Sequence, residues 1–207
     1  MPEALLVVLV LVLIALAVVA IVLVLRTKQR QAQPKATAPA DPFHSADTDA
    51  VRGDPRKLAP GALVEIRGTS YAVRGSLHMA EGAWTWDEHL LETAEGHNAW
   101  LSVEEDPELE LVLFTDVPGE SVSADKTIEL AGTIYRLTDS GTARFTGQGT
   151  TGLNPSGTVK YRDYEGDGKA RLALEDFGTG TWTVSVGEVL SRYEVRVYPD
   201  TSAGEDQ

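Results

Sequence analysis

One phrase of the sequence is written twice, and this repetition constrains the fold more than any other feature. The stretch "VEIRGTSYAV" (64–73) recurs as "IELAGTIYRL" (128–137), with four of ten positions identical and three more exchanging one aliphatic residue for another. Apolar and polar residues alternate on each side of a Gly-Thr step, which is typical of a β-hairpin. We expect two-residue loops at 68–69 and 132–133, with glycine at the first central position of a type II′ turn.

In the first of these hairpins, the alternation predicts that Val64, Ile66, Tyr71 and Val73 face the core. Nineteen Gly and ten Pro in 207 residues favour many short elements over long helices.

The correspondence continues beyond the hairpin. "AWLSVEED" (99–106) aligns with "ARLALEDF" (170–177), so that Leu101 matches Leu172, Glu104 matches Glu175, and Trp100 is replaced by Arg171. An aromatic-rich strand is predicted in each copy, "WTWDEHLL" (84–91) and "VKYRDYEG" (159–166). The second copy is longer, and the Gly, Asn and Pro of "TARFTGQGTTGLNPSG" (142–157) predict a long loop there.

These patterns predict an all-β fold in which two copies bury their apolar faces against each other, as a pseudo-twofold duplicated β-sandwich or barrel-like domain. The predicted boundaries are 58–115 for β repeat 1, 116–125 for a connector, 126–199 for β repeat 2 and 200–207 for a disordered tail.

The first segment indicates where the chain is located. Residues 4–25 form an unbroken apolar run of 22 residues, long enough as a helix to cross a bilayer. No basic region precedes the run and no small-residue cleavage site follows it, which favours a retained transmembrane helix over a signal peptide. Arg26, Lys28, Arg30 and Lys35 follow the run, and the positive-inside rule therefore places the N-terminus outside and the C-terminal domain in the cytoplasm.

Residues 26–57 are rich in Ala, Pro, Asp, Gln and Thr and show no apolar period. Such a segment buries too little apolar surface to offset the entropy lost on ordering, so we expect a flexible linker in which His44 is solvated.

The charge of the chain is unevenly distributed. Residues 1–57 hold seven Lys/Arg and five Asp/Glu, which leaves 18 − 7 = 11 basic and 31 − 5 = 26 acidic residues in the rest of the chain. This excess of acid disfavours nucleic-acid binding and allows a cationic partner, although an acidic surface also serves solubility alone. The chain has no Cys, which excludes disulfides and thiolate chemistry.

The order "LAPGALVEIRGTSYAVRGSL", "WTWDEHLL", "WLSVE" resembles the bacterial family called domain of unknown function 4178, over Leu58 to about Pro199. The resemblance implies duplicated small β-units and no established reaction. Where the family commonly has Tyr after the acid of the second phrase, this chain has His89; Tyr161, Asp163 and Tyr164 of the second copy are closer to the family pattern.

The densest group of reactive side chains is Asp87, Glu88 and His89. Neighbours in a strand point to opposite faces, so Asp87 and His89 share one side and Glu88 shares the other with Trp84 and Trp86. The candidate partner or cation surface therefore comprises aromatic and acidic residues of both copies: Trp84, Trp86, Glu88, Tyr161 and Asp163.

No metal site, cofactor motif or catalytic motif is predicted. The gaps between His78, His89 and His97 match no compact metal-ligand spacing, and surface or turn histidines are the simpler interpretation.

The favoured hypothesis is a membrane-anchored, cytoplasmic, non-enzymatic binding or scaffold module for an unknown protein partner or small cation. One alternative is a sensor of polyamines or other cations, whose ammonium groups suit carboxylates and aromatic faces. The other is a metal-dependent hydrolase that uses Asp87, Glu88 or His89.

Overall fold

The computed structural model describes residues 52–120 and 122–198. The predicted transmembrane helix (4–25), His44 and the tail (200–207) lie outside the described residues. In the described part of the chain, no helix is both long enough and apolar enough to cross a membrane.

The described residues are all-β and form one antiparallel sheet of eleven strands, with two short 3₁₀ helices. The elements in chain order are η1 (Pro55–Lys57), β1 (Leu63–Ile66), β2 (Thr69–Glu81), β3 (Trp84–Glu92), β4 (Asn98–Glu105), β5 (Leu109–Asp116), β6 (Thr127–Leu130), β7 (Thr133–Gly149), β8 (Ser156–Glu165), β9 (Ala170–Asp176), β10 (Thr183–Leu190), η2 (Arg192–Glu194) and β11 (Val195–Tyr198).

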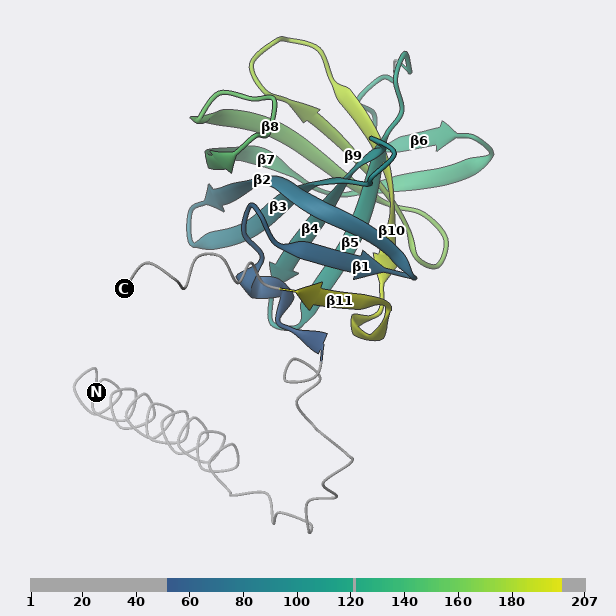
Figure 1. The fold of residues 1–207 in the computed structure, drawn as a ribbon. Coiled ribbons are helices and arrows are strands. Elements are labelled where there is room, and N and C mark those ends of the chain that lie inside the picture. Colours follow the sequence, from purple (N-terminus) through teal and green to yellow (C-terminus); the bar gives the residue numbers. More distant parts are fainter. Residues whose placement is uncertain (1–51, 121, 199–207) are drawn as a thin grey trace, which may run out of the picture. The chain divides into compact units, whose positions relative to one another are not determined.

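The sheet closes on itself, because β2 pairs with β7 as well as with its hairpin partners (Figure 1). The closed ring runs β2-β3-β4-β5-β10-β9-β8-β7 and returns to β2. Of the two predicted architectures, the barrel-like one is therefore observed, and two separate packed sheets are not. At the closure Gly75 lies opposite Gly149, and a Cβ on Gly75 would lie 2.5 Å from the backbone oxygen of Thr150.

The pairings of the first ten strands repeat. β1–β5 pair in succession, β6–β10 do the same, and the two sets join through β5–β10 and β2–β7. Exchanging the first five strands for the next five leaves every one of these pairings unchanged. This is the topology expected of two copies of one five-stranded unit, with β11 added beside β1.

Bulges in the long strands divide each of them between two environments. The register of β2 shifts between Val73 and Gly75, and that of β7 shifts between Leu137 and Asp139. In β2 the extra residue turns the alternation over, so Val73 packs on the outside of the ring whereas Leu77 points inside it.

The apolar core has three parts. Inside the ring lie Leu77, Met79, Ala143, Phe145, Val159 and Tyr161. Outside the ring, β1 and β11 cover a cluster made of Leu58, Ala62, Val64, Ile66, Val73, Leu91, Leu101, Val103, Leu111, Leu190, Val195 and Val197. β6 covers the corresponding outer cluster of the second half, made of Ile128, Tyr135, Tyr164, Leu172, Leu174 and Val184. Of the four predicted core residues, Val64, Ile66 and Val73 are buried and Tyr71 is partly buried.

Two local expectations from the sequence are wrong. The hairpin loops are 67–68 and 131–132, one residue earlier than predicted, and both Arg67 (φ 52°) and Gly68 (φ 83°) have positive φ, which is the type I′ pattern. The predicted long loop at 142–157 is largely strand, since β7 continues to Gly149, where its pairing with β2 closes the ring.

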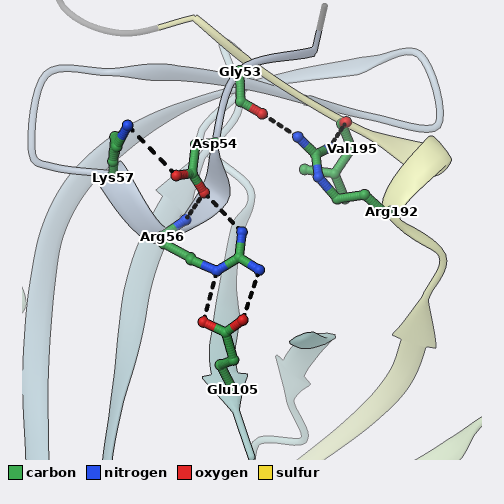
Figure 2. Close-up of polar contacts among 7 residues, drawn as sticks. All are labelled: Gly53, Asp54, Arg56, Lys57, Glu105, Arg192 and Val195. Atoms are coloured by element: carbon green, nitrogen blue, oxygen red, sulfur yellow. Dashed lines mark hydrogen bonds and ion pairs between the residues drawn. The ribbon is translucent and has the colours of Figure 1, made fainter. Parts of the chain in front are cut away.

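The last residues of the predicted flexible linker are ordered. Residues 53–57 pack on the β-domain (Figure 2). Asp54 caps η1, and the Arg56 guanidinium donates to both carboxylate oxygens of Glu105 at 2.8 and 2.9 Å. Arg192 donates to the backbone oxygens of Gly53 and Val195. The rest of the predicted linker, up to residue 51, lies outside the described residues.

Candidate binding cavity

The interior of the ring carries acidic side chains, which enter it through strand alternation. Residues directly opposite each other in an antiparallel pair point to the same face. Trp86 lies opposite Glu104, and Tyr161 lies opposite Glu175. Because Trp86 and Tyr161 are on the inner face, Glu104 and Glu175 point inward as well.

These residues surround a cavity of about 630 Å³. Nine acidic residues line it: Glu81, Glu88, Glu104, Asp106, Glu110, Asp139, Asp163, Glu165 and Glu175. Trp84, Trp86, Trp100, Phe114 and Tyr161 are among its aromatic residues, and Arg171 is the single basic residue that the described part of the chain contributes. A second hollow of about 450 Å³ shares Glu88, Trp100 and Glu175 with the first, so the two adjoin in the middle of the ring.

All five residues of the predicted partner or cation surface line this one cavity. Trp84 stands at its rim and is 57% exposed. The rings of Trp86 and Tyr161 meet edge to face with their centroids 5.6 Å apart, so the two copies are in contact here. Glu88 and Asp163 lie two residues further along the same strands, on the same inner face.

Asp87, Glu88 and His89, the residues named for the alternative hydrolase, lie on two different faces of β3. Glu88 points into the cavity, whereas Asp87 and His89 lie on the opposite face, as the alternation predicted. The Asp87 carboxylate lies 2.8 Å from Nδ1 of His78, and Nδ1 of His89 lies 2.8 Å from the Ser76 hydroxyl.

His89 also corrects the interpretation of the histidines as surface or turn residues. Its side chain is buried, with 3% of the residue exposed, and this burial lowers its pKa to about 4. Across residues 52–120 and 122–198, no three His, Cys, Asp or Glu side chains are grouped closely enough to hold a metal ion.

The acids in the middle of the cavity are half-buried, and their pKa values rise. Burial raises the pKa of Glu88 to about 7, although the Trp86 Nε1–H donates to its carboxylate at 3.1 Å and opposes the rise. The pKa of Asp163 rises to about 7 through burial and through the nearby charge of Glu88. The pKa of Glu175 rises well above its usual value because of burial and because of the nearby charges of Glu88 and Asp163.

Other acids of the cavity are satisfied by neighbouring groups. The Tyr161 hydroxyl donates to the Glu81 carboxylate at 2.5 Å, and the Asp139 carboxylate lies 3.2 Å from the same hydroxyl. Glu81 also accepts the backbone N–H of Thr142. At the other wall the Arg171 guanidinium lies 3.3 Å from Glu110 and 3.6 Å from Glu165.

The carboxylates of Asp163 and Glu175 differ, because neither accepts a hydrogen bond from the described residues. Each points into the cavity beside other acids, and no basic residue in the described part of the chain contributes to the pKa shift of either one. Asp163 and Glu175 are half-buried, and a carboxylate that is partly removed from water without a partner favours keeping a proton or taking up a cation.

Of the acids that line the cavity, the sequence analysis predicted Glu88 and Asp163. It did not predict Glu104 and Glu175, nor Glu81 and Asp139. The sequence did contain a signal for Glu104 and Glu175. These two residues match each other in the repeat, and the strand register places both on the inner face. Glu81 and Asp139 had no such signal, because they meet only where β2 and β7 close the ring.

The comparisons with known proteins identify the family of the chain. Residues 59–192 match the family model described as domain of unknown function (DUF4178). An uncharacterized protein of Mycobacterium bovis and two of Mycobacterium tuberculosis are each 34% identical over 152 residues, covering 70% of this chain and 73% of the relative. No solved structure shows a significant match. The family match spans the ring and the cavity inside it, and the chain belongs to the DUF4178 family.

Proposed function

We propose that the β-domain is a non-enzymatic binding module that holds a small organic cation in its acidic cavity. One observation carries the proposal: the carboxylates of Asp163 and Glu175 face a cavity of about 630 Å³ without a hydrogen-bond donor from the described residues. A cationic ligand supplies the missing positive charge and donors together, which offsets the cost of the buried acids.

The lining of the cavity favours an ammonium compound over other cations. Trp86, Trp100 and Tyr161 present aromatic surface beside the acids, and aromatic faces attract ammonium groups while also contacting the alkyl carbons attached to them. A dehydrated metal ion instead needs several oxygen ligands converging on one point. The preferred ligands are therefore alkylamines and polyamines, the class named as an alternative from the sequence.

The test is isothermal titration of alkylamines and polyamines into the full chain in a neutral detergent at low salt. Binding to the unaltered protein is expected, and loss of that binding is expected in the double variant Asp163→Asn with Glu175→Gln. Glu129 and Asp167 are exposed acids away from the cavity, so Glu129→Gln with Asp167→Asn is the matched control, with an identical change of charge. Equal binding by the two double variants, or no binding by the unaltered chain, would contradict the proposal.

The proposal includes the membrane. The apolar run of residues 4–25 and the basic residues after it support a single-pass anchor with the β-domain on the cytoplasmic side. An anchored chain stays in the membrane pellet after alkaline carbonate extraction. With this orientation, protease added to spheroplasts leaves the β-domain intact until the membrane is opened with detergent. Digestion of the β-domain before the membrane is opened would exclude a cytoplasmic location.

A further inference from the structure

The two copies place equivalent groups inside the ring. In the repeat Leu101 matches Leu172, which makes the following residues, Ser102 and Ala173, equivalent as well. The residue opposite Ser102 in the neighbouring strand is Glu88, and the residue opposite Ala173 is Asp163. Glu88 and Asp163 are therefore the same position of the repeated unit.

The same reasoning relates the next inward pair. Glu104 matches Glu175 in the repeat, and the residues opposite them are Trp86 and Tyr161. Each copy thus contributes one aromatic ring, one carboxylate two residues further along the same strand, and one carboxylate on the adjacent strand. We call these groups half-site 1 (Trp86, Glu88, Glu104) and half-site 2 (Tyr161, Asp163, Glu175).

The two half-sites open into one space. Their aromatic rings are in contact, with centroids 5.6 Å apart, and all six residues line the same cavity. The charges of Glu88 and Glu104 act on Asp163, and those of Glu88 and Asp163 act on Glu175, which places the carboxylates of one half-site within electrostatic reach of the other. One ligand can therefore contact both half-sites.

Among the described residues, four of the five acids outside the half-sites have a partner, and Asp106 is the exception. Arg171 occupies the repeat position equivalent to Trp100 and pairs with Glu110 and Glu165 at the wall of the cavity. The Tyr161 hydroxyl serves Glu81 and Asp139. The carboxylates that still need positive charge are thus concentrated in the half-sites, and they are divided between the two copies.

From this duplication we propose that the ligand is a linear diammonium compound, with one ammonium group at each half-site. This inference rests on the proposed function, which requires only a cation. Once the first ammonium group is bound, the second binds within the same complex and loses less translational entropy than a separate molecule. The touching rings of Trp86 and Tyr161 provide apolar surface between the half-sites for the methylene chain.

The experiment compares putrescine, cadaverine and longer diamines with the monoamine of the same carbon count, by isothermal titration into the full chain in neutral detergent. We expect one diamine per chain, with a dissociation constant at least about tenfold below that of its monoamine, since a hydrogen-bonded charge contributes about 1.5–3 kcal/mol. Glu88→Gln and Asp163→Asn each remove one of the two carboxylates of a half-site, and each is expected to reduce diamine affinity toward the monoamine level. Glu129→Gln and Asp167→Asn are the matched controls.

The outcomes separate the two proposals. Monoamines that bind as tightly as diamines of every length overturn the diammonium ligand and leave the cation-binding function in place. If neither class binds, both proposals fail. Diamine binding that survives both half-site variants also overturns the inference. The comparison of diamines with monoamines on the unaltered chain tests the diammonium ligand even if a variant fails to fold.

Discussion

Replacing Glu88 by glutamine should stabilise the ligand-free domain at alkaline pH. Glu88 lies inside the ring with a pKa of about 7, compared with an ordinary value of 4.5. Between these two values the folded chain holds a proton that the unfolded chain has released, so the free energy of unfolding falls as the pH rises. The loss of stability caused by ionised Glu88 is therefore absent below pH 4.5 and complete above about pH 7.

The magnitude follows from the difference of about 2.5 between the two pKa values. At about 1.4 kcal/mol per pKa unit, the ionised carboxylate costs roughly 3 kcal/mol at pH 8. The glutamine variant is therefore expected to be more stable than the unaltered chain by about 3 kcal/mol at pH 8 and equally stable near pH 4.5. The amide oxygen of glutamine still accepts the Trp86 Nε1–H, and the new amide NH2 faces a cavity that is also lined by the acceptors Asp163 and Glu175.

Urea unfolding of the full chain in neutral detergent, followed by tryptophan fluorescence, measures this effect. All four tryptophans, at 84, 86, 100 and 182, lie in the β-domain, so the signal reports on its unfolding alone. Amine-free buffer prevents a ligand from masking the penalty. Equal stability of the two proteins at pH 8, or a difference of the same size at pH 4.5 and pH 8, would refute a raised pKa of Glu88 in the folded domain. Glu129→Gln, on the exposed surface, should show no such dependence on pH.

Three further predictions concern stability. Gly75→Ala should lower the free energy of unfolding by about 2–3 kcal/mol in urea titrations, because its Cβ would lie 2.5 Å from the Thr150 backbone oxygen at the ring closure. His89→Gln should remove an acid-sensitive contribution: burial lowers the pKa of His89 to about 4 from 6.5, so the unaltered chain loses up to about 3 kcal/mol as the pH falls through this range. Arg56→Ala should cost under about 1 kcal/mol by the same measurement, because its bidentate pair with Glu105 is exposed to solvent and screened by salt.

Each of these predictions has its own contrary result. Gly147→Ala is the control for the closure, since Gly147 is also a strand glycine without positive φ and a Cβ there would meet no atom closer than 3.5 Å; an equal loss at both glycines would contradict the steric explanation. For His89, a stability difference from the glutamine variant that does not change between pH 7 and pH 4 would contradict a neutral buried ring. For Arg56, a loss of several kcal/mol would show that the segment at 53–57 contributes far more to the fold than its exposed ion pair indicates.

The local features of the fold could be predicted from the sequence because they depend on neighbouring residues. Alternation in "WTWDEHLL" placed Glu88 with Trp86 and away from His89, and the structure has them so. The type of the hairpin turn was predicted wrongly, because moving the loop by one residue needs Arg67 at positive φ, a conformation that is uncommon outside glycine, asparagine and aspartate.

The sequence by itself determined the β class, the repeat and the faces of single strands, since a period of two and a Gly-containing turn are properties of a few adjacent residues. The tertiary structure alone decided that the strands form one closed ring, because the β2–β7 and β5–β10 pairings join residues about 70 positions apart. It also decided that β7 continues as strand to Gly149, and that Glu81 and Asp139 meet at the Tyr161 hydroxyl. Only closure brings the inward acids of both copies around one cavity, because the β2–β7 and β5–β10 pairings are what join the two halves of the ring.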